Sequence, residues 1–199
     1  HLELKRFFGV EETLSEKTAD IIWEKCNKAI KENQLTAKKL IEMANVVYIG
    51  TTDDPIDDLR YHKAVKEDKN FKCSVNPSFR PEKAMKIQNE GFKEYIDKLA
   101  KISDIEIKSF DDLKKALEVR LDYFYENGCM ITDHSLERVV FYNFTCEEIN
   151  SIFIKALNGE NRTNEEAAKY SVALLIELGK MYSNRNMVMQ LHIGALRNN

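Results

Sequence analysis

Residues 128–135 read GCMITDHS, a short apolar run that turns polar at its C-terminal end. Three other segments have the same form: NVVYIGTTDD at 45–54, FKCSVNPSFRP at 71–81 and MVMQLHIGALR at 187–197. None of them shows the clean alternation of apolar and polar residues that marks a strand with one solvated face. Continuous apolar strands are typical of a parallel sheet that is covered on both faces. The four segments therefore predict the strands of a parallel α/β fold.

Helical patterns separate these segments, as they do in repeating strand–helix units. The chain has only 7 Gly and 3 Pro in 199 residues, so few residues would interrupt a helix. Hydroxyl side chains that suit N-caps mark five predicted helix starts. They are Ser15, Thr36, Ser109, Thr145 and Thr163, the last of which forms a capping box with Glu166.

Two further helical features follow from the sequence. Pro55 suits the first turn of a helix over 53–68, because proline lacks the N–H that the first turn leaves unbonded. Between 13 and 33, apolar residues recur at helical spacing and predict one core-facing stripe. The stripe consists of Ala19, Ile22, Trp23, Cys26 and Ile30.

Composition excludes several classes of protein. The net charge of −3 disfavours nucleic-acid binding, which needs a concentrated surplus of Lys and Arg. No stretch approaches the roughly 18 apolar residues of a membrane span. The four cysteines have no CxxC spacing, so we interpret them as buried thiols in a reducing compartment and expect a cytoplasmic protein.

Polar side chains gather at the C-terminal end of each predicted strand. In parallel α/β folds these ends meet at one edge of the sheet, where ligands bind. Two arginines, a carboxylate and an imidazole at that edge suit an anionic, hydroxyl-rich substrate, because arginine grips carboxylates in a bidentate fork. Aspartate or histidine there could move protons near neutral pH. The candidates for these roles are Arg80, Asp133, His192 and Arg197; His134 follows Asp133 in the same segment, and Asp53 and Asp54 end the first segment.

Each of these residues also has a purely structural interpretation. Taken singly, they could be a helix N-cap (Asp53 or Asp54), surface side chains (Arg80, Arg197), a turn cap (Asp133, His134), a hydrogen-bonded core histidine (His192) or a solvated helix residue (His62). Their shared position at strand ends favours the functional interpretation. A non-catalytic helical interaction module would show no convergent pocket, so the meeting of these side chains in one cleft distinguishes the two.

Several motifs together resemble the uronate (glucuronate) isomerases. They are GTTDDPIDDLRYH at 50–62, SFRPEKA at 78–84, GCMITDHSLE at 128–137, LNGE at 157–160 and MQLHIGALRNN at 189–199, with HLELKRFFG at the start. The resemblance runs in order over essentially the whole chain. It implies a member of the amidohydrolase superfamily with part of a TIM-type (β/α)8 barrel, in which residues 1–199 form a single incomplete domain and 1–45 are a mainly helical lead-in.

The resemblance also implies an activity, the interconversion of D-glucuronate with D-fructuronate and of D-galacturonate with D-tagaturonate in hexuronate catabolism. By motif position, Asp133 and His192 match catalytic residues, and Arg80 and Arg197 match substrate-binding residues. Which residue is the base stays open. The partner is then a small hexuronate, with no nucleic acid or membrane involved, and a homo-oligomer is compatible with the sequence.

The chain departs from the family pattern in its metal ligands. The family carries a divalent metal, commonly zinc, on an early His-x-His and a late Asp, and neither motif occurs in these residues. We therefore expect a central fragment of a longer enzyme that holds no metal and is inactive alone. A metal-dependent hydrolase of the same superfamily is the alternative enzyme, although only four histidines are available as ligands.

Overall fold

The computed structural model describes residues 1–194 of the chain, in two compact units. The first unit contains His1–Ile49 and Val65–Val75, and the second contains Gly50–Ala64 and the residues from Asn76 onward. That these units make up one domain stays a prediction. None of the described helices is long and apolar enough to cross a membrane. The predicted strand ends lie in the second unit.

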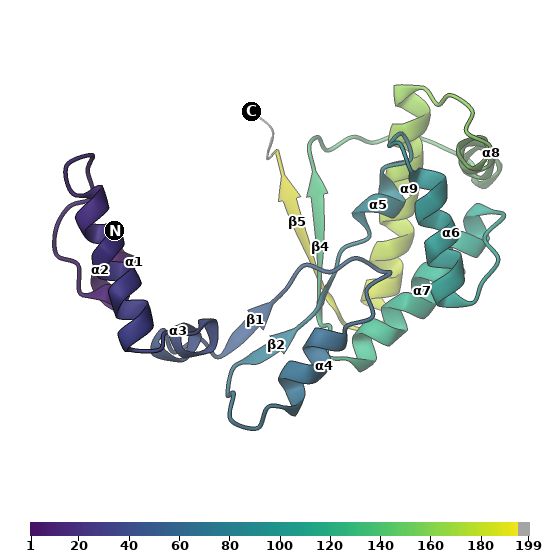
Figure 1. Ribbon diagram of the computed structural model, residues 1–199. Helices are drawn as coiled ribbons and strands as arrows, with labels where there is room; N and C mark the ends of the chain where they lie inside the picture. Colours follow the sequence, from purple (N-terminus) through teal and green to yellow (C-terminus); the bar gives the residue numbers. More distant parts are fainter. Residues whose placement is uncertain (195–199) are drawn as a thin grey trace. The chain divides into compact units, whose positions relative to one another are not determined.

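The first unit begins with three helices, α1 (Leu2–Phe8), α2 (Ala19–Glu32) and α3 (Ala37–Met43). Helix α1 packs along α2 (Figure 1). The predicted core stripe of α2 was wrong in part, because Ile22 is its one buried residue and Trp23 is 70% exposed. The two neighbouring helices, α1 and α3, have only 7 residues each and supply too little surface to cover the stripe.

The predicted cap of this helix was also wrong. Helix α2 begins after Thr18, whose hydroxyl donates to the carbonyl oxygen of Thr13. The Ser15 carbonyl accepts N–H bonds from Thr18 and Ala19, so Ser15 belongs to the turn that precedes the helix.

The four predicted strand segments lie side by side in chain order. Strands β1 (Tyr48–Gly50) and β2 (Ser74–Asn76) form a two-stranded sheet. Strands β3 (Ser78–Phe79), β4 (Ile131–Leu136) and β5 (Val188–Ile193) form a parallel sheet in that order. A parallel bridge between Asp53 and Phe79 joins the end of the first segment to β3. The prediction of a parallel α/β fold, as in part of a barrel, is confirmed.

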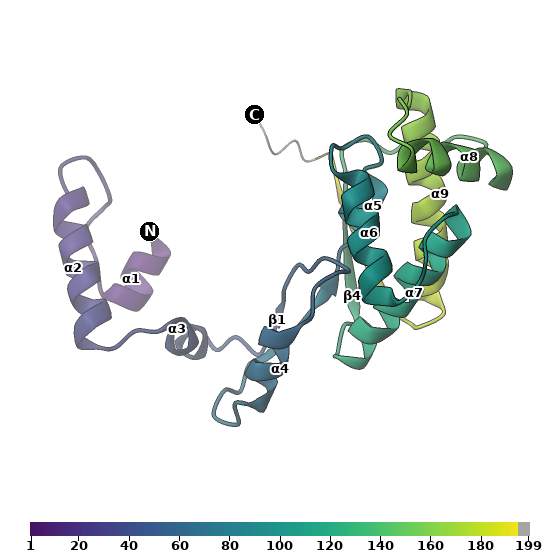
Figure 2. The same cartoon turned by 45° about the vertical axis from the view of Figure 1, so that its right-hand side comes forward.

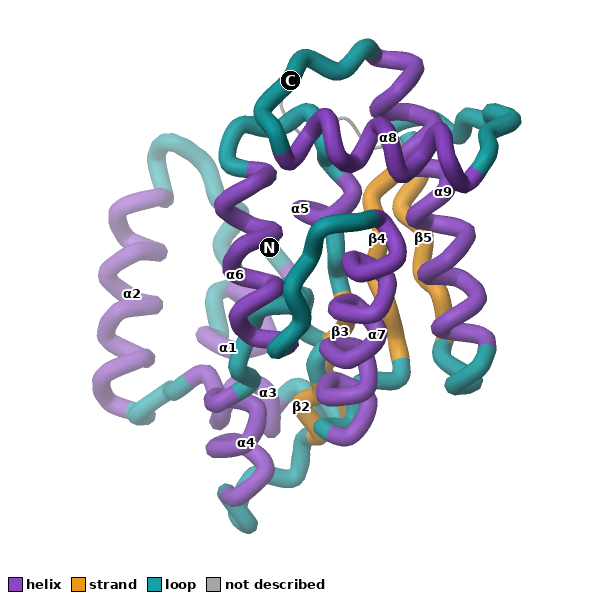
Figure 3. The backbone as a smooth tube through the Cα atoms, turned by 90° about the vertical axis from the view of Figure 1, so that its right-hand side faces the viewer, coloured by secondary structure: helices purple, strands orange, loops and turns teal. Residues whose placement is uncertain are grey.

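Helices of the second unit lie on one side of β4 and β5, as the two ribbon views show (Figures 1 and 2). Seen from the helical side, they stand in front of the strands (Figure 3). These helices are α5 (Glu82–Met85), α6 (Phe92–Ser103), α7 (Phe110–Glu126), α8 (Cys146–Leu157) and α9 (Asn164–Ser183). Aromatic rings fill the space between them, with Phe153 stacked on Tyr170 at 6.1 Å. This layer fixes the sheet that carries the strand ends.

The outer edge of β5 has no neighbour within residues 1–194. Val188, Leu191 and Ile193 on this strand are all more than 40% exposed. Unpaired apolar strands are unfavourable in water because they invite pairing with another chain. The sheet therefore has room for a further strand at β5, as the incomplete barrel predicts.

The caps of α3, α7, α8 and α9 were predicted correctly. In each of them the hydroxyl at the N-cap accepts the N–H three residues on, and Thr163 with Glu166 forms the full capping box. Such a bond satisfies a donor that the helix itself leaves unbonded.

Replacing Thr163 with alanine is expected to lower the free energy of unfolding by about 1 kcal/mol, because the N–H of Glu166 loses the hydroxyl that accepts it. Thermal or denaturant unfolding of the variant measures the change. Thr163→Ser, which keeps the hydroxyl, serves as the control and is expected to lose only a few tenths of this amount. Equal losses in both variants would contradict a role for the hydroxyl.

Pro55 does not start a helix, contrary to the prediction. Helix α4 (Arg60–Glu67) begins five residues later. The reason lies in three aspartates whose carboxylates each accept the backbone N–H two residues on, namely Asp54, Asp57 and Asp58. Such side-chain turns compete with helical hydrogen bonds. They keep residues 54–59 in a loop.

Buried Arg120 of α7 holds this loop in place. Its guanidinium donates from Nε to the carbonyl oxygen of Pro55 at 2.7 Å and from Nη2 to that of Asp57 at 2.8 Å. It also stacks over the Tyr123 ring, 4.3 Å from the centroid. Burial lowers the pKa of Arg120 from its ordinary value. The loop that leads from the first strand end into α4 is therefore rigidly anchored.

Candidate active site

Three of the four predicted site residues meet across β3, β4 and β5, at the C-terminal ends of β3 and β5 and in the middle of β4. Arg80 follows β3 directly, Asp133 lies on β4 opposite Gln190 of β5, and His192 lies two residues further along β5. Asp133 is central, because its Oδ2 is 3.3 Å from Arg80 Nη1 and its Oδ1 is 3.3 Å from His192 Nε2. The His192 contact lacks hydrogen-bond geometry, and His192 Nε2 lies nearer to Gln190 Nε2, at 2.6 Å.

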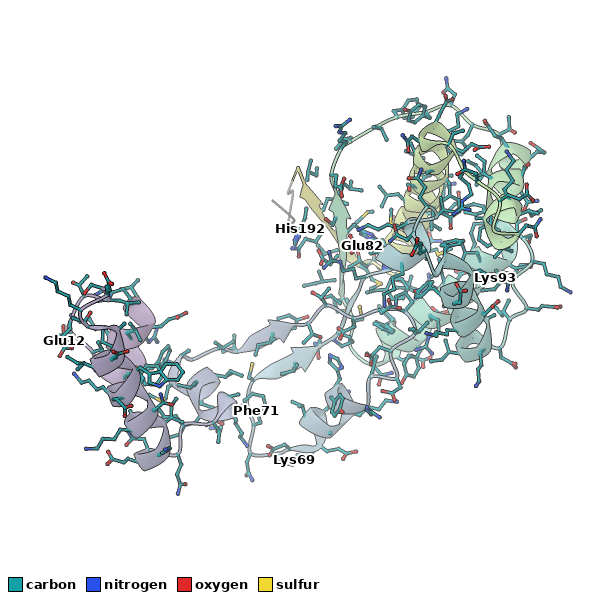
Figure 4. The ribbon with its side chains drawn as sticks, turned by 45° about the horizontal axis from the view of Figure 1, so that its top comes forward. Glu12, Lys69, Phe71, Glu82, Lys93 and His192 are labelled. Atoms are coloured by element: carbon teal, nitrogen blue, oxygen red, sulfur yellow. The ribbon has the colours of Figure 1, made fainter. Side chains whose placement is uncertain are left out.

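The Arg80 guanidinium is held between two carboxylates. Besides Asp133, Glu82 of α5 places Oε2 3.3 Å from Nη2. Figure 4 shows Glu82 at the start of α5 and His192 on β5. The Arg80 and Asp133 side chains are only 15% and 9% exposed, and Arg80 Nε finds no hydrogen-bond partner within residues 1–194. A buried donor without a partner is costly, so Arg80 keeps capacity to bind a further acceptor.

His134 points away from this group, because successive residues of a strand face opposite sides of the sheet. Its ring lies 5.5 Å from that of Tyr182 on α9, in the layer between sheet and helices. Neither ring nitrogen has a hydrogen-bond partner among the described residues, and the side chain is almost fully buried. Burial lowers its pKa to about 4, so His134 is neutral at pH 7. The interpretation of His134 as a turn cap was wrong.

Asp53 and Asp54 do not cap a helix, since α4 begins only at Arg60. Asp53 Oδ2 accepts the hydroxyl of Thr51 at 2.6 Å and the N–H of Ser78 at 3.1 Å. Asp54 Oδ1 accepts the hydroxyl of Tyr95 at 2.9 Å. Burial, together with the charge of Asp54, raises the pKa of Tyr95 far above its usual range. Both carboxylates are therefore fixed by donors at the strand end.

A cavity of about 260 Å³ opens beside these residues. Lys83 lies 3.1 Å from Asp54 Oδ2, so the cavity presents cations and carboxylates alternately. Such a lining suits a small polyhydroxy anion, because its carboxylates accept hydrogen bonds from hydroxyl groups and its Arg and Lys side chains bind carboxylate groups. The lining consists of Thr52, Asp53, Asp54, Arg80, Glu82 and Lys83.

A larger cavity of about 480 Å³ lies between the start of α6 and the end of α8. It contains none of the predicted site residues, and Lys93, one of its lining residues, lies well away from Glu82 and His192 in Figure 4. The smaller cavity is the better candidate because Arg80, which contacts Asp133, lines it, whereas Asp133 and His192 are not among its lining residues.

His62 was interpreted from the sequence as a solvated helix residue, and this interpretation was wrong. Its side chain is 12% exposed, and its Nε2 lies 2.7 Å from Thr51 Oγ1 and 3.7 Å from Asp53 Oδ1. The sequence held a signal for it, because His62 ends the same motif, GTTDDPIDDLRYH, that contains Thr51 and Asp53. Arg197, the fourth predicted residue, lies outside the described residues.

The residues at this edge do not fit a metal ion on their own. Within residues 1–194, no group of three or more His, Cys, Asp or Glu side chains could hold a metal. Asp133 and His192 offer two donors, whereas zinc in proteins takes three or four protein ligands. We therefore derive no chemical step through a metal.

Comparison with known proteins decides the family. A sequence model described as glucuronate isomerase (UxaC) matches residues 1–199. The chain belongs to this family. The uronate isomerase of Clostridium perfringens is 88% identical over 199 residues, which cover all of this chain and 43% of the relative. That of Caldicellulosiruptor saccharolyticus is 47% identical and covered to 42%. The chain thus spans less than half the length of these glucuronate isomerase relatives.

Solved structures give the same assignment. The crystal structure of uronate isomerase from Thermotoga maritima superposes with a TM-score of 0.92 at 34% identity, over all of this chain and 43% of the other. Glucuronate isomerase from Caulobacter crescentus gives a TM-score of 0.88 at 23% identity, over 98% of this chain and 40% of the other. At that identity the second likeness shows the fold alone. The described residues therefore have the fold of the corresponding part of a glucuronate isomerase.

Proposed function

We propose that this chain is the central part of a uronate isomerase that interconverts D-glucuronate with D-fructuronate and D-galacturonate with D-tagaturonate. The observation that carries the proposal is the family match over residues 1–199, with 88% identity to a protein named uronate isomerase. The enzyme acts in the cytoplasm in hexuronate catabolism, and its partner is the small-molecule sugar acid. The meeting of Arg80, Asp133 and His192 argues against a non-catalytic helical module.

The isomerisation passes through an enediol and moves one proton from C2 to C1 and one from O2 to O1. Asp133 and His192 are the candidates to carry the proton between the carbons, and Asp133 Oδ1 lies 3.3 Å from His192 Nε2. Arg80 and Arg197 bind the substrate carboxylate and the oxyanion that develops on the enediol. A divalent metal, where the full-length enzyme holds one, would polarise the substrate oxygens.

The charges around Arg80 constrain how the acid binds. One guanidinium faces two carboxylates, Glu82 and Asp133, so its positive charge is already offset. A substrate carboxylate must displace Glu82 or bind with the help of a second cation. This supports the assignment of a further arginine, Arg197, to the same task.

The proposal is tested by assaying the full-length protein with D-glucuronate and D-galacturonate and detecting the ketose product. We expect conversion of at least one of the two sugars by the full-length enzyme and none by residues 1–199 alone, because the described part, residues 1–194, offers no group of three metal ligands. The control is a neutral aldohexose, which should not react because it lacks the carboxylate. Failure to convert either uronate would reject the function.

A further inference from the structure

Asp53 fastens the segment that ends in Arg80. The backbone N–H of Asp53 donates to the carbonyl oxygen of Ser78 at 3.0 Å, and the N–H of Arg80 donates to the carbonyl oxygen of Asp53 at 2.9 Å. The Asp53 carboxylate accepts the N–H of Ser78 at 3.1 Å. Asp53 thus bonds to Ser78 and to Arg80, the residues on either side of Phe79. We call these three hydrogen bonds the clasp, and the place of Arg80 relative to β4 depends on it.

The Asp53 carboxylate is itself held through Thr51 by His62. Thr51 Oγ1 lies 2.6 Å from Asp53 Oδ2 and 2.7 Å from His62 Nε2. A carboxylate has no proton to give, so the single hydroxyl proton of Thr51 points to Asp53. The carbonyl oxygen of Asn76 also lies near Thr51 Oγ1, but at 3.3 Å it is farther than the Asp53 carboxylate. The hydroxyl therefore accepts from the ring, and the neutral His62 ring carries its proton on Nε2. The bonds run in one direction, from His62 through Thr51 to Asp53.

Burial strengthens the hydrogen bonds that run from His62 through Thr51 to Asp53. The side chains of His62 and Asp53 are 12% and 11% exposed, and hydrogen bonds to a carboxylate strengthen as water is excluded. His62 Nδ1 is buried and has no hydrogen-bond partner among the described residues. The ring is therefore held through its Nε2 side, and that side faces Thr51.

We propose that His62 is a positioning residue for the isomerase, acting through Thr51 and Asp53 to fix Arg80 at the mouth of the cavity. The proposal rests on the proposed function, because it assigns His62 to the same site. Within residues 1–194, the polar contacts of His62 are with Thr51 and Asp53 and none is with Arg80, so its effect on the reaction passes through the clasp.

The first test measures the clasp without any assay of activity. Hydrogen exchange is followed in the full-length enzyme by mass spectrometry on peptides that cover residues 74–82. His62→Leu and Thr51→Val should each speed exchange at the Ser78 and Arg80 amides severalfold, whereas His62→Gln, whose side-chain amide reaches as far as Nε2, should stay close to wild type. Tyr61→Leu, at a residue of the same helix that is 71% exposed, is the control and should change nothing.

The second test asks whether His62 acts through Arg80. His62→Leu should lower kcat/KM for the uronate about tenfold, since a misplacement of about 1 Å in a binding group can cost about 100-fold. In an Arg80→Lys background the same substitution should cost less than about twofold, because the group being positioned is already impaired. His62→Gln should restore most of the activity.

The outcomes separate cleanly. Exchange at wild-type rates in His62→Leu, or an equal loss of activity with and without Arg80, would overturn the proposal. If wild-type enzyme converts no uronate, the proposed function fails, and the exchange experiment alone still decides whether His62 holds the clasp. If His62→Leu does not fold, Thr51→Val, which keeps the shape and removes only the hydroxyl, takes its place in both tests.

Discussion

Replacing Arg80 with lysine in the full-length enzyme is expected to lower kcat/KM for D-glucuronate about 100-fold, as the loss of one preorganised donor at a reacting oxygen does. The guanidinium presents several donors in a flat fork, and here it bridges Asp133 and Glu82 while its Nε has no hydrogen-bond partner among the described residues. A lysine keeps the charge but places it at one point, so it cannot hold these carboxylates and grip the substrate carboxylate in two places.

Steady-state kinetics with both uronates measure this effect. Arg60→Lys, at an exposed arginine of α4, is the matched control and should leave kcat/KM unchanged. Circular dichroism and the unfolding midpoint show whether Arg80→Lys remains folded. Unchanged kinetics in Arg80→Lys would reject the substrate-binding role.

His134 is expected to make the stability of the fold depend on pH. Burial lowers its pKa from the ordinary value of 6.5 to about 4. Because the folded state binds the proton less readily than the unfolded state, the contribution of His134 is fully present above about pH 6.5 and is lost as the pH falls toward about 4. The difference of pKa corresponds to about 3 kcal/mol of free energy of unfolding at about pH 4.

The test compares wild type with His134→Phe, a ring of similar shape that cannot take up a proton beside Tyr182. Denaturant unfolding at a series of pH values gives the free energy for each protein, and the other titrating groups cancel in the difference. Wild type should lose about 3 kcal/mol more than the variant between about pH 7.5 and about pH 4. Parallel pH profiles for the two proteins would contradict the buried neutral histidine.

Local chemistry made much of the fold predictable. The caps at Thr36, Ser109, Thr145 and Thr163 were found because a hydroxyl and the N–H three residues on lie within one turn. The strand segments were found because parallel strands buried on both faces need continuous apolar runs. Their polar ends predicted a shared edge, where Arg80, Asp133 and His192 do lie together. The catalytic and binding roles of these residues stay predictions.

Interactions between distant segments explain what was missed. The loop after Asp54 was read as a helix because its proline suits a first turn, but three aspartate turns and Arg120, more than sixty residues away in sequence, hold it in another conformation. His62 looked solvated because its helix is highly charged, yet Thr51 and the strand end bury it. Neither Arg120 as the partner of the loop nor Thr51 as the partner of His62 can be identified from spacing along the chain.

The sequence by itself determined the family, the four strand segments, most of the helices between them, and the polar side chains that follow the apolar runs. These depend on motifs and on contacts within a few residues, where chain geometry leaves few alternatives. The tertiary structure alone decided which face of the sheet each side chain takes, so that Asp133 meets Arg80 while His134 lies against Tyr182. Those choices depend on packing among segments far apart in the chain, and it is this packing that shapes the cavity and its charges.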